Sequence, residues 1–321
     1  MGKIACLFPG QGSQSVGMGG DLVKEFEEAR QLFQTVDQIA GRSLSKLCFQ
    51  GPEEELKRTV NTQPTILSVS LAAWKCYQSL GGPKPDFVAG HSLGEFTALV
   101  AAEVLTVEEA VSLVEKRAHL MEGCPKGAMS AVLGVPADVL EKCCADAHTE
   151  LKEGGAKDTE AVVIVANFNT RDQLVISGNP SAVAKAGEKA KAAGGKVIPL
   201  PVGGAFHSPL MTAASIEFAS EIGKAKFRNA SCNVVQNFDA KPSTNADEIK
   251  EKLSRQMESA VRWCPTIEYM LSQGVDTFVE IGPGKVLVGT VKKIDKSAKM
   301  FNVSDSTNLK ATIQELVHAL V

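Results

Sequence analysis

A serine between two glycines is the residue whose surroundings most directly indicate covalent chemistry. The stretch GHSLG at 90–94 fits the pattern Gly-x-Ser-x-Gly and lies between an apolar run at 86–90 and the start of a helical pattern. In such a strand-to-helix turn the serine has a strained backbone, and side chains at the glycine positions would collide. The turn exposes the hydroxyl and aims the amide of Leu93 at a developing oxyanion. We therefore expect Ser92 to be a nucleophile; the alternative is a glycine-rich turn whose serine only caps the helix.

A nucleophilic serine needs a base, and His207 is the best candidate. It follows two glycines and directly precedes Ser208-Pro209, which are expected to cap and begin a helix, so its ring can face a cleft. An ordinary loop histidine is the alternative. His91 is adjacent to the serine, and we expect it to point away and to be structural. The remaining histidines lie in helical patterns with charged neighbours: His119, His148 and His318.

No aspartate stands out as the acid of a Ser–His–acid triad. Hydrolases of that type usually place the acid between the serine and the histidine in chain order. The aspartates in this interval all fall in a segment that we interpret as an inserted subdomain: Asp138, Asp146, Asp158 and Asp172. This weakens the interpretation of the chain as a plain serine hydrolase.

A glycine-containing loop follows the first predicted strand. In FPGQGSQ, at 8–14, glycines at 10 and 12 allow backbone amides to approach a ligand closely, as a second oxyanion donor would have to. The alternative is a phosphate cradle. However, the spacing is neither Gly-x-Gly-x-x-Gly nor a Walker Gly-Lys-Ser/Thr, which makes a nucleotide ligand a poor fit.

An arginine lies at the margin of an amphipathic helix expected at 106–122. The helix begins with a capping box formed by Thr106 and Glu109. At about 100° per residue its apolar residues form one stripe, and Arg117 falls at the edge of that stripe. The guanidinium either snorkels at the margin of the core or points into the site and grips a substrate carboxylate through two parallel hydrogen bonds.

The composition restricts the classes of protein to consider. The 321 residues are 44% hydrophobic and 22% charged, with a formal net charge of −3, which is typical of a globular chain and argues against nucleic acid as the main partner. No apolar run reaches the ~18 residues that span a bilayer. A strand pattern begins almost at Met1, where a signal peptide would stand. We expect neither nucleic acid nor a membrane among the partners.

Cysteine and histidine usage gives no sign of a metal site. The eight cysteines include no Cys-x-x-Cys pair, and several lie in apolar periodic stretches, which favours buried thiols in a reducing compartment. The five histidines form no cluster with cysteine or aspartate at metal-ligand spacing. We predict no metal and no cofactor.

The chain divides into segments with two different patterns of predicted strands and helices. Residues 3–127 alternate short apolar runs with amphipathic stretches, as in a parallel sheet with helices on its faces. Residues 128–202 follow a β-α-β-β-α-β order, the ferredoxin-like pattern. After residue 202 the first pattern, strands alternating with amphipathic helices, resumes. We predict an α/β fold with a hydrolase-like core, a parallel sheet flanked by helices, formed by 1–127 and 203–321. The segment 128–202 would be an inserted ferredoxin-like α+β subdomain. The elements expected in the core are helices at 22–40, 62–80, 93–102, 106–122, 209–223, 246–258, 265–273, 285–294 and 308–320, and strands at 4–8, 86–90, 232–238 and 275–281.

Seven segments, taken together and in order, resemble the malonyl-coenzyme A:acyl carrier protein transacylase family. Gly-x-Ser-x-Gly alone occurs in many enzymes, whereas the whole set is specific and runs from about residue 4 to about residue 290. The family's architecture, a hydrolase-like α/β core with a ferredoxin-like insert, agrees with the pattern above. The segments are FPGQGSQ at 8–14, NTQP at 61–64, GHSLGE at 90–95, Arg117, ANFN at 166–169, GAFHS at 204–208 and EIGPGKVL at 280–287.

The resemblance implies a role for each matching residue. Ser92 would be the acylated nucleophile and His207 its base, and the amides of Leu93 and Gln11 would form the oxyanion hole. Arg117 would bind the free malonyl carboxylate.

In this family a backbone carbonyl orients the histidine, and the residue that supplies this carbonyl matches Gln256 in this sequence. A carbonyl in this role would account for the missing acid. Gln63 and Asn167 match positions that line the substrate site. GAFH before the base resembles the malonyl-selective version of this segment, in which Phe206 would crowd a branched acyl chain. Such a branch changes binding by only ~1–3 kcal/mol, so the expectation is a preference and not exclusion.

The partners implied by the resemblance are malonyl-coenzyme A and a holo acyl carrier protein, in a ping-pong transfer that supplies fatty-acid chain elongation. We expect a monomer. Its compartment would be the cytoplasm of a bacterium, or a plastid or other organelle if the chain is a mature one without its import peptide. Two rival functions stay open: a serine hydrolase, which has no use for Arg117, and a carrier-binding module that binds without reacting.

Overall fold

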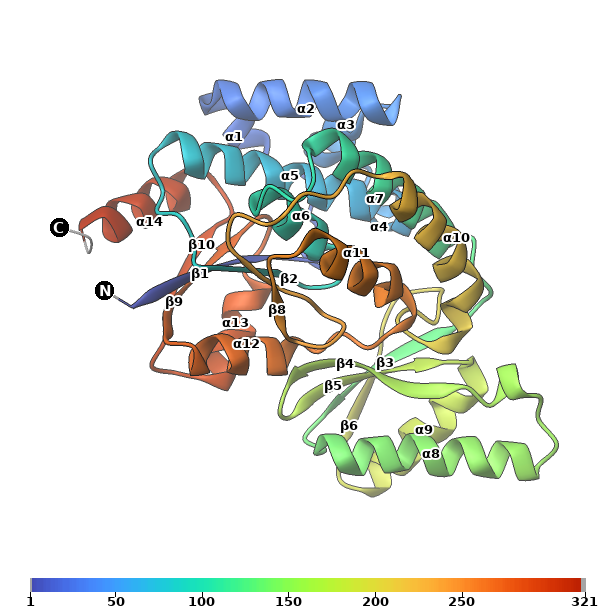
Figure 1. Ribbon diagram of the computed structural model, residues 1–321. Coiled ribbons are helices and arrows are strands. Elements are labelled where there is room, and N and C mark those ends of the chain that lie inside the picture. The colour runs from blue at the N-terminus through green and yellow to red at the C-terminus, as the bar shows by residue number, and fades with distance from the viewer. Residues whose placement is uncertain (1, 319–321) are drawn as a thin grey trace.

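A six-stranded sheet forms the centre of the larger part of the computed structural model, which describes residues 2–318 (Figure 1). The strand order is β10-β9-β1-β2-β7-β8, and neighbouring strands are parallel except for β7 and β8. The strands are β1 (Lys3–Phe8), β2 (Phe87–Gly90), β7 (Asn233–Val235), β8 (Pro242–Ser243), β9 (Val275–Ile281) and β10 (Lys299–Val303).

Helices cover both faces of this sheet, which explains why its central strand β1 is apolar from Ile4 to Phe8. In β1 the side chains of Cys6 and Phe8 pack into one core cluster and those of Ala5 and Leu7 into another, so neither face meets solvent. One face is covered by α12 (Trp263–Ser272) and α13 (Val286–Ile294). The remaining helices of this part are α1 (Gly20–Glu25), α2 (Glu27–Ala40), α3 (Leu44–Gln50), α4 (Glu53–Lys57), α5 (Thr59–Ser79), α6 (Gly94–Ala101), α7 (Val107–Glu122), α10 (Thr212–Lys224), α11 (Ala246–Arg255) and α14 (Ser306–His318).

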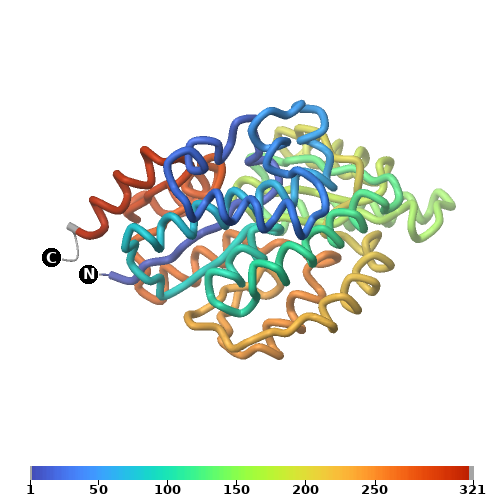
Figure 2. Tube along the Cα trace, turned by 90° about the horizontal axis from the view of Figure 1, so that it is seen from above, coloured from blue at the N-terminus to red at the C-terminus, as the bar shows by residue number. Residues whose placement is uncertain are grey.

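A second, four-stranded sheet lies at the opposite end of the molecule from α14 (Figures 1 and 2). Its order is β4-β5-β3-β6, and every neighbouring pair is antiparallel. Two helices and the sheet share a separate core cluster, whereas Met129, Ala166 and Val175 belong to the main core. The elements are β3 (Ala128–Leu133), α8 (Ala137–Glu153), β4 (Val163–Thr170), β5 (Gln173–Gly178), α9 (Pro180–Ala192) and β6 (Lys196–Pro199).

The predicted fold class, an α/β fold with a parallel sheet flanked by helices and a separate antiparallel sheet, is confirmed. The second sheet lies within residues 128–199 and has the expected strand–helix–strand–strand–helix–strand order. The domain limits at 127/128 and 202/203, and the ferredoxin-like name for the insert, stay predictions. No helix within residues 2–318 is long and apolar enough to span a membrane.

Some elements differ from the expected ones. The helix expected at 22–40 is two helices, because the backbone of Phe26 is extended (φ −117°, ψ 130°) between α1 and α2. Strand β10 was not expected, since this edge strand is only partly buried and its sequence KMFNV has neither a buried apolar run nor clear alternation. The short helices α3 and α4 were missed as well.

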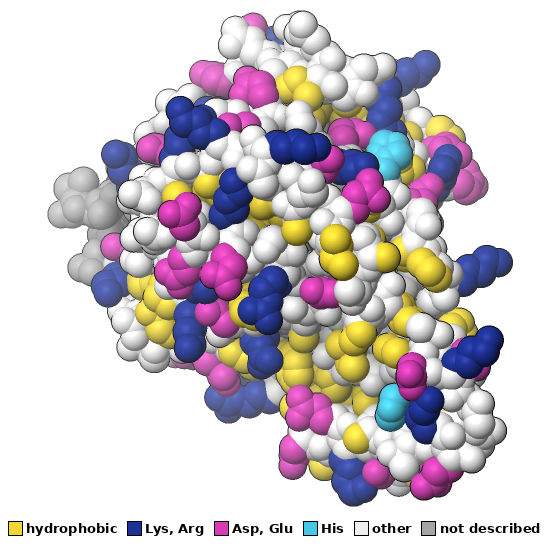
Figure 3. All heavy atoms as spheres, turned by 45° about the vertical axis from the view of Figure 1, so that its right-hand side comes forward, with side chains coloured by type: hydrophobic (Ala, Val, Ile, Leu, Met, Phe, Trp, Pro, Cys, Tyr) yellow, Lys and Arg dark blue, Asp and Glu magenta, His cyan; other side chains and the backbone are white. Residues whose placement is uncertain are grey.

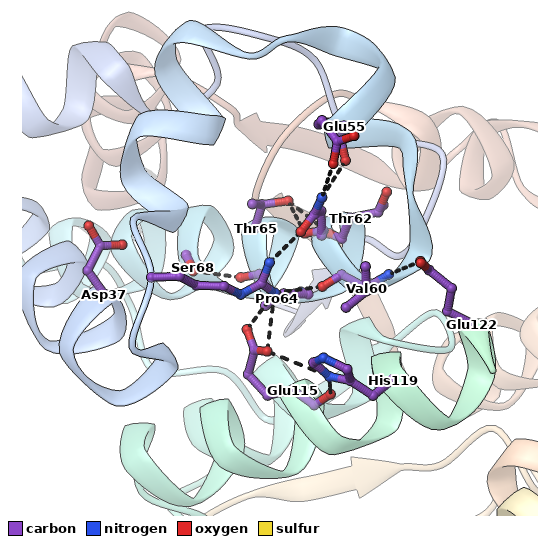
Figure 4. A network of polar contacts seen from close by, with 12 residues as sticks. Asp37, Glu55, Val60, Thr62, Pro64, Thr65, Ser68, Glu115, His119 and Glu122 are labelled. Carbon is purple, nitrogen blue, oxygen red and sulfur yellow. Dashed lines mark hydrogen bonds and ion pairs between the residues drawn. The ribbon is translucent and has the colours of Figure 1, made fainter.

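A polar network ties the start of α5 to α7, the two helices that carry Gln63 and Arg117 (Figure 4). The guanidinium of Arg42 donates to Glu115 Oε1 of α7 at 2.9 Å, to the Val60 carbonyl of α5 at 2.7 Å and to Asn61 Oδ1. In addition, Glu122 Oε2 accepts a hydrogen bond from the amide of Val60 at 2.8 Å.

Replacing Arg42 should therefore destabilise the fold more than replacing an ordinary surface arginine. In Arg42→Ala the partly buried carboxylate of Glu115 loses its guanidinium partner, and we expect the free energy of unfolding to fall by about 2 kcal/mol in urea titrations. The matched control is Arg171→Ala, whose side chain is 79% exposed and pairs with Glu268 at the surface, where we expect less than ~1 kcal/mol. An equal decrease in the free energy of unfolding in the two variants would contradict a stabilising role for the hydrogen bonds of Arg42.

Candidate active site

The turn between β2 and α6 holds Ser92 in a left-handed backbone conformation, with φ 51°. The glycines on either side make the turn possible. A Cβ on Gly90 would lie 1.9 Å from the carbonyl carbon of Gly94, and a Cβ on Gly94 would lie 2.0 Å from the carbonyl oxygen of Phe8. Both clashes are with backbone atoms, which cannot move aside cheaply. The spacing of the glycines thus follows from how tightly the strand, turn and helix meet.

His207 approaches Ser92 from a loop 115 residues further along the chain. Its Nε2 lies 2.7 Å from Ser92 Oγ, and its own backbone is also left-handed, with φ 57°. On the other side of the ring, Nδ1 lies 3.1 Å from the carbonyl oxygens of Gln256 and Ser259. Carbonyls only accept, so Nδ1 carries the proton and the lone pair on Nε2 faces the serine hydroxyl.

The environment of His207 keeps its ring neutral. Burial is the main cause and the nearby positive charge of Arg117 the next, and together they lower the pKa from 6.5 to about 3, against the two carbonyl hydrogen bonds. A neutral imidazole with its free nitrogen on a hydroxyl has the arrangement of a general base.

The guanidinium of Arg117 lies inside the protein and in contact with the nucleophile. The residue is only 1% exposed. Nη1 donates to Gln63 Oε1 at 2.6 Å, and Nη2 donates to Ser92 Oγ at 3.1 Å and to Gln256 Oε1 at 3.0 Å. Burial lowers the pKa of Arg117 to about 10, partly offset by Glu95, so the group stays charged at neutral pH. The snorkelling alternative therefore does not describe this residue.

A cavity of about 180 Å³ opens above Ser92 between the two sheets. Hydrophobic side chains also gather on the surface between the larger and the smaller part of the molecule (Figure 3). The sequence-predicted residues that line the cavity are Gln11, Gln63, Ser92, Leu93, Arg117, Asn167, Phe206 and His207. The structure thus brings together residues from β4, α5, α7 and several loops, while Gln256 lies behind Ser92 and does not line the cavity.

Two backbone amides in this cavity are available to a ligand. Among the hydrogen bonds within residues 2–318, none uses the N–H of Gln11 or of Leu93. Leu93 is the N-cap residue of α6, at the end of the helix where backbone amides have no partner within the helix. Such N–H groups suit an oxygen that gains negative charge.

Sequence reasoning missed four polar residues that support the site. Asn169 accepts a hydrogen bond from His91 Nε2 at 2.8 Å, and both residues line the cavity beside Ser92. The carbonyl of Ser259 is a second acceptor for His207. Asn237 and Glu95 are buried behind the serine turn. Asn169 and Glu95 stand in the segments ANFN and GHSLGE, and Ser259 lies three residues after Gln256, whereas nothing in the sequence around Asn237 indicates a contact with Ser92.

His119 and His148 do not line the cavity. His119 lies on α7 beside Glu115, and His148 Nδ1 lies 2.9 Å from the carbonyl of Ala161; the side chain of His318 is outside the described part of the chain. Among residues 2–318, no group of three or more His, Cys, Asp and Glu side chains has the geometry to hold a metal ion.

Taken together, these groups suit acyl transfer through a serine ester. Ser92 Oγ donates to a neutral imidazole and accepts from a buried cation, two free amides line the same space, and the guanidinium can pair with a carboxylate on the acyl group.

Comparison with known proteins points to one family. Residues 6–313 match the model described as the acyl transferase domain. The chain is 43% identical over 320 residues to the malonyl CoA-acyl carrier protein transacylase of Bacillus subtilis (strain 168), covering 98% of each chain.

Solved structures agree with this. The malonyl CoA-acyl carrier protein transacylase from Coxiella burnetii superposes with a TM-score of 0.92 at 37% identity, covering 98% of both chains. A malonyl-transacylase solved in complex with its type II PKS acyl-carrier protein gives a TM-score of 0.91 at 38% identity, covering 98% of this chain and 99% of that one.

The low pKa of His207 predicts an unusual pH dependence. A base works only while unprotonated, and a lowered pKa keeps it so to lower pH; activity is then lost as the pH falls through the folded-state pKa. We expect the rate at which a fluorophosphonate labels Ser92 to stay constant from pH 7.5 down to about 5. In Arg117→Gln, which removes the second-largest cause of the lowered pKa of His207, the acid limb should move towards 6.5 without reaching it because burial persists. A wild-type midpoint near 6.5 would contradict this account of the ring.

Proposed function

The chain belongs to the acyl transferase family, as a member of its malonyl-CoA:acyl carrier protein transacylase group, and from that premise we propose that Ser92, His207 and Arg117 transfer malonyl groups from malonyl-CoA to acyl carrier protein. The single observation that carries this proposal is the pair of contacts at Ser92 Oγ. One is a 2.7 Å hydrogen bond to a neutral imidazole, and the other is a 3.1 Å hydrogen bond from a buried guanidinium.

The first half of the reaction acylates the serine. His207 Nε2 takes the proton from Ser92 Oγ as the oxygen attacks the thioester carbonyl of malonyl-CoA. The oxyanion of the tetrahedral intermediate accepts hydrogen bonds from the amides of Gln11 and Leu93. When the C–S bond breaks, the imidazolium returns its proton to the sulfur of coenzyme A, and a malonyl ester is left on Ser92.

The second half reverses these steps with a different thiol. The phosphopantetheine thiol of a holo acyl carrier protein gives its proton to His207 and attacks the ester. The same two amides stabilise the intermediate, and Ser92 leaves with the proton from the imidazolium. The product is a malonyl thioester of the carrier, the substrate of fatty-acid chain elongation. No step needs a metal or another cofactor.

Arg117 selects acyl groups that end in a carboxylate. A guanidinium pairs with a carboxylate through two parallel hydrogen bonds, and this one is close enough to contact the serine itself. When malonyl binds, Arg117 exchanges its contact with Ser92 Oγ for the substrate carboxylate, which places the thioester carbonyl next to the nucleophile.

Backbone carbonyls take the place of the acid that is missing from the sequence. The carbonyl oxygens of Gln256 and Ser259 fix the proton of His207 on Nδ1, as the carboxylate of a Ser–His–Asp triad does. Neutral acceptors stabilise the imidazolium less than an anion would, and they add no negative charge that would repel the malonyl carboxylate.

Three further cavity residues complete the proposed acyl site. Phe206 is buried at its wall and would crowd a branch on the acyl chain, and Gln63 accepts from Nη1 of Arg117, the guanidinium nitrogen that does not contact Ser92. Asn167 offers a polar side chain to the same space.

Partners and location follow from the same chemistry. We infer that the acyl donor is malonyl-CoA and that the acceptor is a separate holo carrier protein; the solved complex of a related malonyl-transacylase with its acyl-carrier protein supports this. The proposal includes a monomeric enzyme without nucleic-acid or membrane partners. It would work in the bacterial cytoplasm, or in an organelle that carries out the same synthesis.

Incubation with malonyl-CoA should add one malonyl group to the protein at Ser92, seen as a single mass increment in intact-mass spectra. Addition of a holo carrier should then move the group to the carrier thiol. Ser92→Ala should form no adduct. A wild type without adduct, or an equal adduct on Ser92→Ala, would end the proposal. Rapid loss of the adduct to water without acylation of the carrier would favour the serine hydrolase.

The role of Arg117 predicts a change in acyl preference. In Arg117→Ala we expect kcat/KM for malonyl transfer to fall by about 100-fold or more, because a buried charge-assisted pair is lost. Transfer of acetyl, which has no carboxylate, should change far less. Parallel assays with malonyl-CoA and acetyl-CoA measure the ratio directly, and equal losses with both thioesters would show that Arg117 does not recognise the carboxylate.

A further inference from the structure

A buried carboxylate three residues beyond the nucleophile has no part in the reaction described above. Glu95 lies in the first turn of α6 and is 1% exposed. Its oxygens accept from N–H donors: Gln236 Nε2 at 3.0 Å, the Asn237 amide at 2.9 Å and Gln256 Nε2 at 3.2 Å. Burial raises the pKa of Glu95, and these hydrogen bonds and the charge of Arg117 oppose that shift. All three partners donate, which suits the ionised form.

The side-chain amide of Gln256 connects this carboxylate to the site. Its Nε2 donates to Glu95 Oε2 and to the Ser92 carbonyl at 2.9 Å, and its Oε1 accepts from Arg117 Nη2 at 3.0 Å. If the amide were reversed, its NH₂ would face the donor Arg117, and its oxygen would face two acceptors. Only one orientation satisfies all of these groups, and Glu95 is the charged member that enforces it.

We propose that Glu95 is a positioning residue for carboxylate selection: it fixes the amide of Gln256 so that Oε1 holds Arg117 where the malonyl carboxylate binds. This inference rests on the proposed function. Glu95 and Arg117 form no direct ion pair among the described residues, and Gln256 hydrogen-bonds to both, so the effect passes through that amide.

The same carboxylate also supports the serine turn, and the two effects are separable. Asn237, whose amide donates to Glu95, accepts from the Ser92 amide through Oδ1 and donates to the Gly90 carbonyl through Nδ2, both at 2.7 Å. A weaker turn slows every acyl transfer equally. A displaced Arg117 slows only the transfer of groups that carry a carboxylate. The ratio of malonyl to acetyl acylation therefore isolates the positioning of Arg117.

The test uses Glu95→Gln in the full-length protein. This change removes the charge and sets an amide NH₂ against groups that are themselves donors, so we expect the Gln256 amide to leave its orientation. The second-order rates of Ser92 acylation by malonyl-CoA and by acetyl-CoA are measured by quenched-flow intact-mass spectrometry. We expect the malonyl-to-acetyl ratio to fall at least tenfold from the wild-type value. An unchanged ratio overturns the inference.

A double-mutant cycle shows whether the effect passes through Gln256. Gln256→Ala keeps the backbone carbonyl that faces His207 and removes the amide, so its ratio should fall as in Glu95→Gln. In the Gln256→Ala background, Glu95→Gln should cause no further fall in the ratio. A full additional fall would mean that the charge of Glu95 acts directly, and would overturn the proposed route. If Glu95→Gln does not fold, Gln256→Ala alone serves as the test. An unchanged malonyl-to-acetyl ratio in Gln256→Ala then overturns the inference.

Glu280→Gln is the matched control for the loss of a buried carboxylate. Glu280 lies at the end of β9 and accepts from the amides of Leu287 and Val288 at 3.0 and 2.9 Å, away from the cavity residues. We expect this variant to lose thermal stability and to keep the wild-type ratio. An equal fall in its ratio would show a global effect and overturn the inference. A wild type that forms no malonyl adduct would instead end the proposed function, so the two failures are distinguishable.

Discussion

The backbone of Ser92 is held in a left-handed conformation, and the other groups of the site are arranged around this residue. A non-glycine residue in that region costs about 1–3 kcal/mol unless its surroundings enforce it. Here Asn237 accepts from its amide and Gln256 donates to its carbonyl, so both backbone groups of the serine have a partner. The flanking glycines let strand and helix meet closely enough for the hydroxyl to stand in the cavity.

A buried cation beside a neutral base is the second organising feature of the site. Arg117 helps to keep His207 unprotonated, and it donates a hydrogen bond to Ser92 Oγ. Under the proposed function, a bound malonyl carboxylate offsets that positive charge, and the base then accepts the serine proton more readily. A substrate without a carboxylate gives no such compensation. Recognition of the malonyl carboxylate and activation of Ser92 would thus depend on the same guanidinium.

Much of the fold and the site was predictable from local patterns, because a strand–turn–helix unit depends on residues that are neighbours in the sequence. Gly-x-Ser-x-Gly predicted the turn at Ser92, and the apolar run at 4–8 predicted a strand of a parallel sheet flanked by helices, which is β1. The sequence did not predict that Arg117 is fully buried. Periodicity places a residue on one face of a helix, but it does not indicate which other elements pack against that face. A partner such as Asn237 reaches the site only through tertiary packing, and the residues around it in the sequence carry no signal for this contact.

The central claim is that one pocket combines an activated serine with a guanidinium that reads the acyl group, and a crystal structure of the malonyl-enzyme tests it most directly. The account predicts an ester on Ser92 Oγ, its carbonyl oxygen within hydrogen-bond distance of the amides of Gln11 and Leu93, and its free carboxylate paired with both Nη atoms of Arg117. An ester whose carboxylate points into solvent, with Arg117 still on its present protein partners, would contradict it.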